Sequence, residues 1–222
     1  EYPLAPGNSG HEGMGIVESC PSGRYEVGER VLLYGFDRPL FQQYVLARDD
    51  GGCIRLPSTG ELDVMLMSQL FGTVLHAFYK LDCIIGQDAV VMGQGPVGQL
   101  FNAALRNLGA RRIIAVDPQA HRLAIATQMG ATHTLPQGDG LEAQVRSICD
   151  GELPQLVVEA VGKEETFQLA ASLLRRNGTL LYFGVPNKEE GRGVMSIDFL
   201  RMFVNETRII TTVGPNPQVD YR

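Results

Sequence analysis

The residues with the clearest chemical meaning form a glycine-rich stretch, Gly93-Gln94-Gly95-Pro96-Val97-Gly98, which has the spacing GxGxxG. Between a strand and a helix, the first glycine of this pattern permits a tight turn and the second lets the backbone approach a pyrophosphate. The third lets the helix pack closely on the strand. The helix expected from Pro96 and Val97 onward offers free N–H groups and a partial positive charge to phosphates. The stretch therefore predicts a dinucleotide site.

An acidic residue, Asp117, stands where such a site needs one, 19 residues after Gly98 and directly after the apolar run Ile113-Ile114-Ala115-Val116. A carboxylate there can accept hydrogen bonds from both hydroxyl groups of an adenosine ribose, whereas it would repel a 2′-phosphate. NAD is therefore the predicted cofactor, in preference to NADP. Two alternatives stay open. One is a glycine turn that only packs a strand against a helix; the other is a methyltransferase that uses S-adenosylmethionine, although such loops rarely keep three glycines in this spacing.

The elements that must position these residues follow from the pattern of the chain after about residue 86, where short apolar runs alternate with helical periodicity. Strands are predicted at residues 88–92, 113–116, 132–135, 156–160, 179–183 and 208–213. Helices are predicted at residues 96–108, 120–129, 141–149, 164–175 and 196–204. Because parallel strands need crossover connections, this alternation predicts a doubly wound α/β fold with a parallel six-stranded sheet.

Residues 1 to about 68 have a different pattern, with short β-like runs separated by Gly and Pro. Strands are expected at residues 15–18, 30–34 and 41–46, which is typical of a small β-rich unit. The chain therefore divides into a β-rich part, residues 1–70, and a dinucleotide-binding part, residues 71–214, followed by residues 215–222.

Charge and composition exclude several classes of protein. The 19 Lys and Arg against 25 Asp and Glu give a net charge of −6, so we expect no nucleic-acid partner. Hydrophobic residues make up 44% of the chain, which supports a packed core rather than disorder. No apolar run approaches the ~20 residues that a membrane span needs. Four scattered cysteines form no CxxC pair and suit a reducing compartment, so a cytoplasmic location is expected.

Together these residues resemble the medium-chain dehydrogenase/reductase family, which includes the zinc-type alcohol, polyol and threonine dehydrogenases. The resemblance covers almost the whole chain. The family's GHExxGxV, VGDRV and FAEYV elements are similar to Gly10-His11-Glu12-Gly13-Met14-Gly15-Ile16-Val17, Val27-Gly28-Glu29-Arg30-Val31 and Phe41-Gln42-Gln43-Tyr44-Val45. Further matches, in the family's order, are Leu56-Pro57, the glycine-rich stretch, Asp117, Gly130-Ala131, Glu159-Ala160-Val161-Gly162 and Phe183-Gly184-Val185-Pro186.

The resemblance implies a partial GroES-like catalytic domain in residues 1–70 and a Rossmann domain in residues 71–214. Residues 215–222 would begin the return to the catalytic domain. A hydride would move between substrate and nicotinamide in a cleft between the two domains. Because the family has further segments at both ends, we expect these 222 residues to be part of a longer polypeptide.

The resemblance also implies roles for individual residues. Thr73 falls where the family places a threonine against the nicotinamide ring, and Arg122 matches a basic residue that reaches the adenosine ribose. Val161, Gly184 and Val185 fall on loops at strand ends that would line the nicotinamide pocket. For Thr73 and Val161, a role in packing alone is the alternative.

The metal residues of the family are only partly matched. The cysteine-rich lobe that holds a structural zinc is absent, so no structural zinc is expected. For a catalytic zinc the matching positions are His11, Glu12 beside it, and Gln69. A neutral amide is a weaker zinc donor than Cys, His or a carboxylate. The alternatives are a packing role for His11, an arginine partner for Glu12, and an ordinary polar helix position for Gln69.

The resemblance therefore predicts an NAD-dependent dehydrogenase that acts on a small alcohol, polyol or amino alcohol, or on the corresponding ketone, with zinc assistance. His11, Glu12 and Thr73 would be its catalytic residues. One alternative is a zinc-free quinone or enone reductase of the same fold, and another is a nucleotide-binding protein without catalysis. By analogy with the family we also expect a homodimer or homotetramer.

Overall fold

The computed structural model describes residues 10–34, 39–47, 53–186 and 195–214. The described residues fall into two compact units, one ending at Thr73 and the other comprising Val74–Gly214. The predicted return segment, residues 215–222, lies outside the described residues. In the part of the chain that is described, no helix is both long and apolar enough to cross a bilayer.

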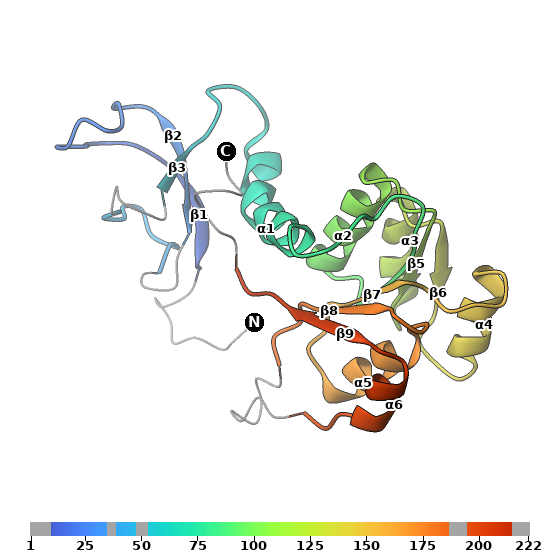
Figure 1. The fold of residues 1–222 in the computed structure, drawn as a ribbon. Helices are drawn as coiled ribbons and strands as arrows, with labels where there is room; N and C mark the ends of the chain where they lie inside the picture. The colour runs from blue at the N-terminus through green and yellow to red at the C-terminus, as the bar shows by residue number, and fades with distance from the viewer. Residues whose placement is uncertain (1–9, 35–38, 48–52, 187–194, 215–222) are drawn as a thin grey trace. The chain divides into compact units, whose positions relative to one another are not determined.

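The first unit contains a small antiparallel sheet with the strand order β1-β2-β3, drawn in blue in Figure 1. Its strands are β1 (Glu12–Ile16), β2 (Arg30–Tyr34) and β3 (Cys53–Arg55). Val31 and Leu32 of β2 are buried, and the hydroxyl of Tyr25 donates a hydrogen bond of 2.8 Å to the Cys53 carbonyl oxygen. The predicted β-rich unit is thus present, with β1 beginning three residues earlier than expected.

The strand predicted at residues 41–46 is wrong. These residues form no strand, although their composition is β-like. Phe41, Tyr44 and Leu46 are exposed, Leu46 to 96%. A strand exists only through pairing with a neighbour, which local composition does not reveal. The third strand of this sheet is instead β3, which the sequence pattern did not indicate.

The helix α1 (Leu62–Phe78) carries Gln69 and Thr73, both buried. The second unit then alternates strands and helices. Its strands are β4 (Asp88–Met92), β5 (Arg112–Val116), β6 (His133–Leu135), β7 (Leu156–Glu159), β8 (Thr179–Tyr182) and β9 (Arg208–Thr211). Its helices are α2 (Pro96–Asn107), α3 (Ala120–Gln128), α4 (Leu141–Ile148), α5 (Glu164–Ser172) and α6 (Phe199–Val204). The six strands and five helices predicted here are confirmed, with ends shifted by up to three residues.

All six strands are parallel and lie in the order β6-β5-β4-β7-β8-β9. This is the doubly wound Rossmann order, in which the direction of winding reverses between β4 and β7. Figure 1 shows α2 and α3 on one face of the sheet and α5 and α6 on the other. Because helices cover both faces, the central strands are mostly apolar, and every residue of β4 is buried.

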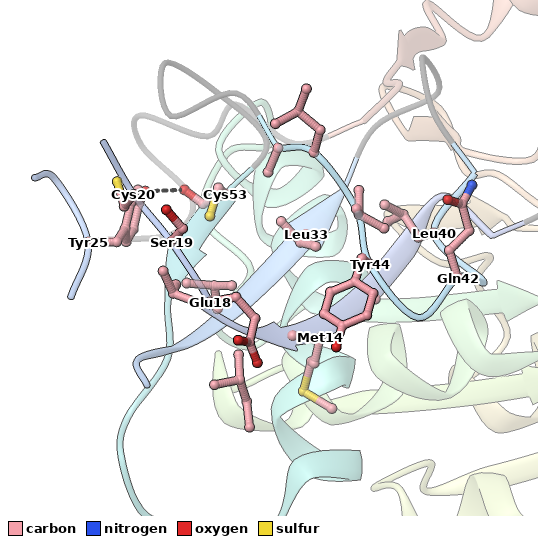
Figure 2. Close-up of a pocket in the computed structure, with 18 of the residues that line it drawn as sticks. Met14, Glu18, Ser19, Cys20, Tyr25, Leu33, Leu40, Gln42, Tyr44 and Cys53 are labelled. Atoms are coloured by element: carbon pink, nitrogen blue, oxygen red, sulfur yellow. Dashed lines mark hydrogen bonds between the residues drawn. The ribbon is translucent and has the colours of Figure 1, made fainter. Parts of the chain in front are cut away.

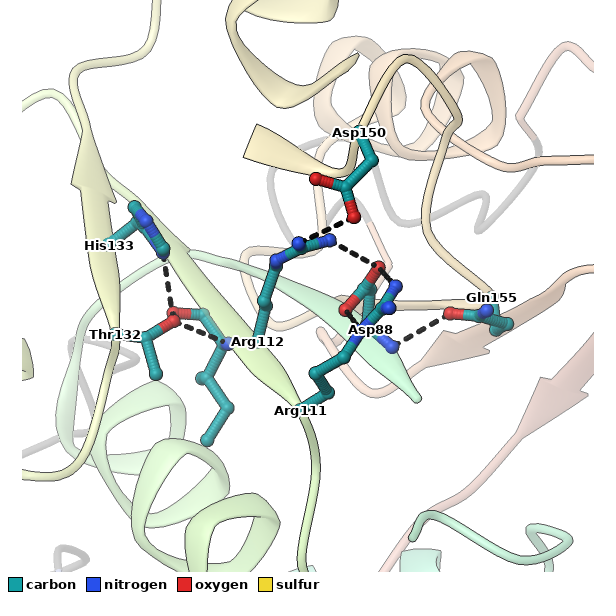
Figure 3. Close-up of polar contacts among 8 residues, drawn as sticks. Asp88, Arg111, Arg112, Thr132, His133, Asp150 and Gln155 are labelled. Carbon is teal, nitrogen blue, oxygen red and sulfur yellow. Dashed lines mark hydrogen bonds and ion pairs between the residues drawn. The ribbon is translucent and has the colours of Figure 1, made fainter. Parts of the chain in front are cut away.

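A polar cluster holds the amino-terminal ends of β4 and β5 together (Figure 3). The buried Asp88 carboxylate accepts a hydrogen bond of 2.8 Å from Arg111 Nε and lies 3.3 Å from Arg112 Nη1. Arg112 also pairs with Asp150 at 2.6 Å. Burial alone would raise the pKa of Asp88, but hydrogen bonds and charge from the two arginines outweigh it, so the pKa is lowered. The cluster lies at the amino-terminal ends of these strands, whereas the glycine-rich loop lies at the carboxyl end of β4.

Candidate functional site

The glycine-rich loop begins where β4 ends and continues directly into α2. Gly93 has a φ of +89°, a conformation that residues with a side chain rarely adopt. A Cβ atom at Gly98 would collide with the Gly93 carbonyl oxygen, so the close approach of α2 to the loop requires glycine. Both glycines are therefore explained by the fold of the loop itself.

Gly95 differs from these two glycines, because a Cβ atom there would meet nothing within 4 Å. Its backbone, with φ −70° and ψ −175°, is open to any residue. Packing within the described chain therefore gives no reason for glycine at this position. A bound phosphate that contacts the backbone is a reason for glycine here, because the methyl group of any larger residue would occupy the space that the phosphate needs. The loop thus fits a pyrophosphate.

The amino terminus of α2 has the properties of an anion site. Pro96 lies in the first turn, Gly95 is the N-cap, and no side chain caps the first N–H groups. These groups and the helix dipole therefore face the open side of the loop, where they favour negative charge.

The shape of the loop depends on Gln94, which is 1% exposed. Its side-chain amide donates a hydrogen bond of 2.9 Å to the Val91 carbonyl oxygen and accepts one of 2.7 Å from Asn102 Nδ2. Gln99 Nε2 donates to the Gln94 carbonyl oxygen at 3.1 Å. Sequence reasoning missed this residue, because the GxGxxG pattern treats its position as variable.

Asp117 lies at the carboxyl end of β5 and is 2% exposed. Its Oδ2 accepts a hydrogen bond of 2.8 Å from the Gln94 backbone N–H, and its Oδ1 accepts one of 2.8 Å from that of Gln119. Arg122 Nη1 is 3.6 Å from Oδ2. Each carboxylate oxygen can accept two hydrogen bonds, so the two backbone contacts orient the group and leave acceptor capacity for a sugar.

The loops after β7 and β8 meet beside the glycine-rich loop. A Cβ atom at Gly93 would lie 2.6 Å from Val161 Cγ2, and one at Gly162 would collide with the Val185 carbonyl oxygen. One at Gly184 would collide with the Gly162 backbone nitrogen. The structure therefore brings Gly93, Val161, Gly184 and Val185 together at one edge of the sheet, where open α/β sheets bind ligands.

The predicted metal residues all lie in the first unit. His11 and Glu12 are adjacent at the start of β1, with 3.4 Å between His11 Nε2 and Glu12 Oε1. Gln69 and Thr73 lie on α1, where the Thr73 hydroxyl donates a hydrogen bond of 2.7 Å to the Leu70 carbonyl oxygen. Within the described ranges, no three His, Cys, Asp or Glu side chains form a group that could hold a metal ion.

A large open hollow of about 1200 Å³ also lies in the first unit. Figure 2 shows Met14 and Leu33 of its sheet, with Tyr44 and Cys20 from flanking segments. None of the predicted site residues lines this hollow. The candidate site is therefore the edge of the parallel sheet rather than this hollow.

Comparison with known proteins identifies the family of the chain. The zinc-binding dehydrogenase family profile matches residues 96–222, which is more than half of the chain. The sorbitol dehydrogenase of Bacillus subtilis is 30% identical over 181 residues, covering 79% of this chain and 50% of that protein. The L-threonine 3-dehydrogenase of Pectobacterium carotovorum is 26% identical over 192 residues, covering 86% and 54%. The chain thus spans about half the length of these curated relatives.

Solved structures show the same fold. A protein from Sinorhizobium meliloti 1021, described as a zinc-binding dehydrogenase and solved with NADP, superposes with a TM-score of 0.84 at 22% identity. The match covers 100% of this chain and 72% of that one. On the evidence of the family profile, supported by this fold, the chain belongs to the zinc-binding dehydrogenases of the medium-chain dehydrogenase/reductase family.

Proposed function

We propose that the protein is an oxidoreductase that transfers a hydride between NAD(H) and a small alcohol, polyol or amino alcohol, or the corresponding ketone. The observation that carries the proposal is Gly95, a glycine that packing among the described residues does not require and that lets a phosphate approach the amino terminus of α2. The substrate class is inferred from the relatives, a sorbitol and a threonine dehydrogenase.

In this proposal the chain's own residues bind and orient the dinucleotide. The N–H groups at the start of α2 hold the pyrophosphate, and Asp117 accepts hydrogen bonds from the adenosine ribose. Arg122 lies beside that carboxylate. The nicotinamide supplies the hydride acceptor or donor, and Val161, Gly184 and Val185 line its pocket. Thr73 contacts the ring in this proposal, on the strength of the family pattern.

NAD is proposed as the cofactor, because a buried carboxylate fixed by two backbone N–H groups cannot turn away from a 2′-phosphate. Titration of the purified chain with NADH and NADPH, followed by nicotinamide fluorescence, tests this point. We expect NADH to bind at least ~10-fold more tightly, since a phosphate would face like charge. Equal affinity for the two cofactors would contradict the NAD preference.

The zinc part of the proposal rests on His11, Glu12 and Gln69. Catalytic zinc sites use three protein ligands and an open position, and the metal acts there as a Lewis acid. His11 and Glu12 offer two good donors, whereas the Gln69 amide is a weak one. The described residues therefore fit a zinc site incompletely, and the hydride transfer proposed above is not routed through the metal.

Elemental analysis of the unchelated full-length protein separates the alternatives. About one zinc per chain would support zinc-assisted alcohol oxidation. Its absence, together with NADH binding and turnover of quinones or enones, would favour the zinc-free reductase. NADH binding without turnover across alcohols, quinones and enones would identify a nucleotide-binding protein.

We also propose that the protein is a homodimer or homotetramer. The helix α6 exposes apolar side chains, including Phe199 and Phe203 at 69% and 72%, and β9 is an edge strand of the described sheet. Such patches are typical of interfaces. Sedimentation velocity tests this, and a single species with the mass of one chain would contradict it.

A further inference from the structure

A buried carboxylate at the centre of the sheet has no evident role in its packing. Glu159 is the last residue of β7 and is 0% exposed. Within the described residues, no lysine, arginine or histidine pairs with it, and its side-chain partners are uncharged. Burying such a group costs free energy unless hydrogen bonds compensate. The role of such a group is therefore to be sought in its hydrogen bonds.

The side chain of Glu159 organises the loop that follows β7. Its Oε1 accepts hydrogen bonds from the backbone N–H groups of Val161, at 3.1 Å, and Gly162, at 3.0 Å. The Thr166 hydroxyl, at the start of α5, lies 2.6 Å from the same oxygen. The loop therefore wraps around the carboxylate, and Val161 is held by it.

The loop after β8 depends on the same residue. The Glu159 carbonyl oxygen accepts hydrogen bonds from the backbone N–H groups of Phe183, at 2.9 Å, and Gly184, at 3.0 Å. A Cβ atom at Gly184 would come within 2.7 Å of Glu159 Oε2, so this loop packs directly on the carboxylate. The Glu159 side chain thus holds Val161 by a hydrogen bond and packs against Gly184, the residue before Val185, while the backbone carbonyl of the same residue holds the loop after β8.

The groups proposed to hold the adenosine diphosphate half of the dinucleotide are separate from Glu159. Asp117 and the backbone of Gln94 lie at the ends of β5 and β4, and none of their hydrogen bonds involves Glu159. We propose that Glu159 is a positioning residue for the nicotinamide half of the dinucleotide, while the glycine-rich loop and Asp117 hold the adenosine diphosphate half. This inference rests on the proposed dinucleotide function.

The substitution Glu159→Gln tests the proposal, because it keeps the size of the side chain and replaces one acceptor oxygen by a donor. The amide oxygen can take the place of Oε1, so the NH₂ group would take the place of Oε2, which lies 3.1 Å from the Gly162 backbone nitrogen, a donor too. The matched control is Asp88→Asn, which changes another buried carboxylate of the same sheet, at the amino-terminal end of β4. It reports what a loss of stability alone does to binding.

Calorimetric titration with NADH and with ADP-ribose, which lacks the nicotinamide, gives the decisive comparison. We expect Glu159→Gln to weaken NADH binding roughly tenfold and to change ADP-ribose binding less than about twofold. Asp88→Asn should leave both affinities unchanged. A parallel loss of NADH and ADP-ribose binding, or no loss of either, would overturn the role of Glu159.

If Glu159→Gln does not fold, Thr166→Val removes one hydrogen-bonding partner of the carboxylate and is measured in the same way. The selective loss of NADH binding is again expected, about threefold because only one contact is removed. Wild-type protein that binds neither NADH nor ADP-ribose would instead overturn the dinucleotide function, and this inference with it.

Discussion

The carboxylate of Asp117 accepts a hydrogen bond of 2.8 Å from the backbone N–H of Gln94, a residue 23 positions earlier in the chain. This bond ties the end of β5 to the glycine-rich loop after β4. The group proposed to recognise the ribose is therefore also part of the loop proposed to hold the phosphates, and a substitution at Asp117 acts on both.

The first prediction concerns Asp117→Asn, which keeps one acceptor oxygen and removes the negative charge. NADH affinity should fall about tenfold, because charge-assisted hydrogen bonds to the ribose are lost. NADPH affinity should fall less or rise, since the repulsion of a 2′-phosphate is removed. Fluorescence titration with both cofactors measures this. An unchanged ratio of the two affinities would contradict the proposal that Asp117 discriminates between NADH and NADPH.

A second prediction compares two glycines of one loop. Gly95→Ala should change the free energy of unfolding by less than about 1 kcal/mol, because the backbone there suits alanine whereas the N-cap position favours glycine. It should nevertheless weaken NADH binding at least ~10-fold, since the methyl group enters the phosphate space. Gly98→Ala should cost about 1–3 kcal/mol of stability through its collision with Gly93. Urea unfolding and NADH titration of both variants provide the test.

A third prediction concerns pH and Asp88, whose pKa is lowered in the folded protein. A lowered pKa means that Asp88 contributes its stability above the pKa of the unfolded chain, about 3.9, and loses it as the pH falls toward the folded value. The wild type should therefore lose stability below about pH 4 more steeply than Asp88→Asn. At pH 7 this variant should be about 1–3 kcal/mol less stable. If the stabilities of the wild type and of Asp88→Asn fell equally with decreasing pH, the stabilising role of the Asp88 ion cluster would be contradicted.

A fourth prediction concerns the thiols. Burial raises the pKa of Cys149 to about 11, whereas Cys83 is exposed. Because the thiolate is the reactive form, Cys83 should react with a thiol reagent within minutes at pH 8, and Cys149 only as the protein unfolds. Mass spectrometry of the labelled peptides over time distinguishes the two. Labelling of Cys149 as fast as Cys83 in the folded protein would show that the core around α4 opens readily.

The parallel sheet was predictable from sequence because its signals are local. Runs such as Ala89-Val90-Val91-Met92 are apolar throughout, which is typical of strands covered on both faces, and each is followed by a helical pattern. The positive φ of Gly93 and the close packing at Gly98 were predictable for the same reason, since both constraints lie within one strand–turn–helix unit.

Other features depended on contacts between distant residues. The three-residue strand β3 exists because it pairs with β2, as at Leu32 and Ile54, whereas residues 41–46 form no strand despite their β-like composition. Gln94 and Glu159 carry no recognisable sequence signal of their roles. Each becomes informative only when its hydrogen bonds to Asn102 or to the loop at Gly162 are seen.

The reversal of strand order between β4 and β7 has a consequence for the dynamics of the second unit. The two halves of the sheet, β6-β5-β4 and β7-β8-β9, are joined in the sheet by the β4–β7 pairing alone. A dinucleotide held by Asp117 on one side and by the Glu159 loops on the other would bridge that seam. Binding energy would then oppose any separation of the two halves. Backbone amides in both halves would therefore exchange with deuterium more slowly in the bound protein than in the free protein.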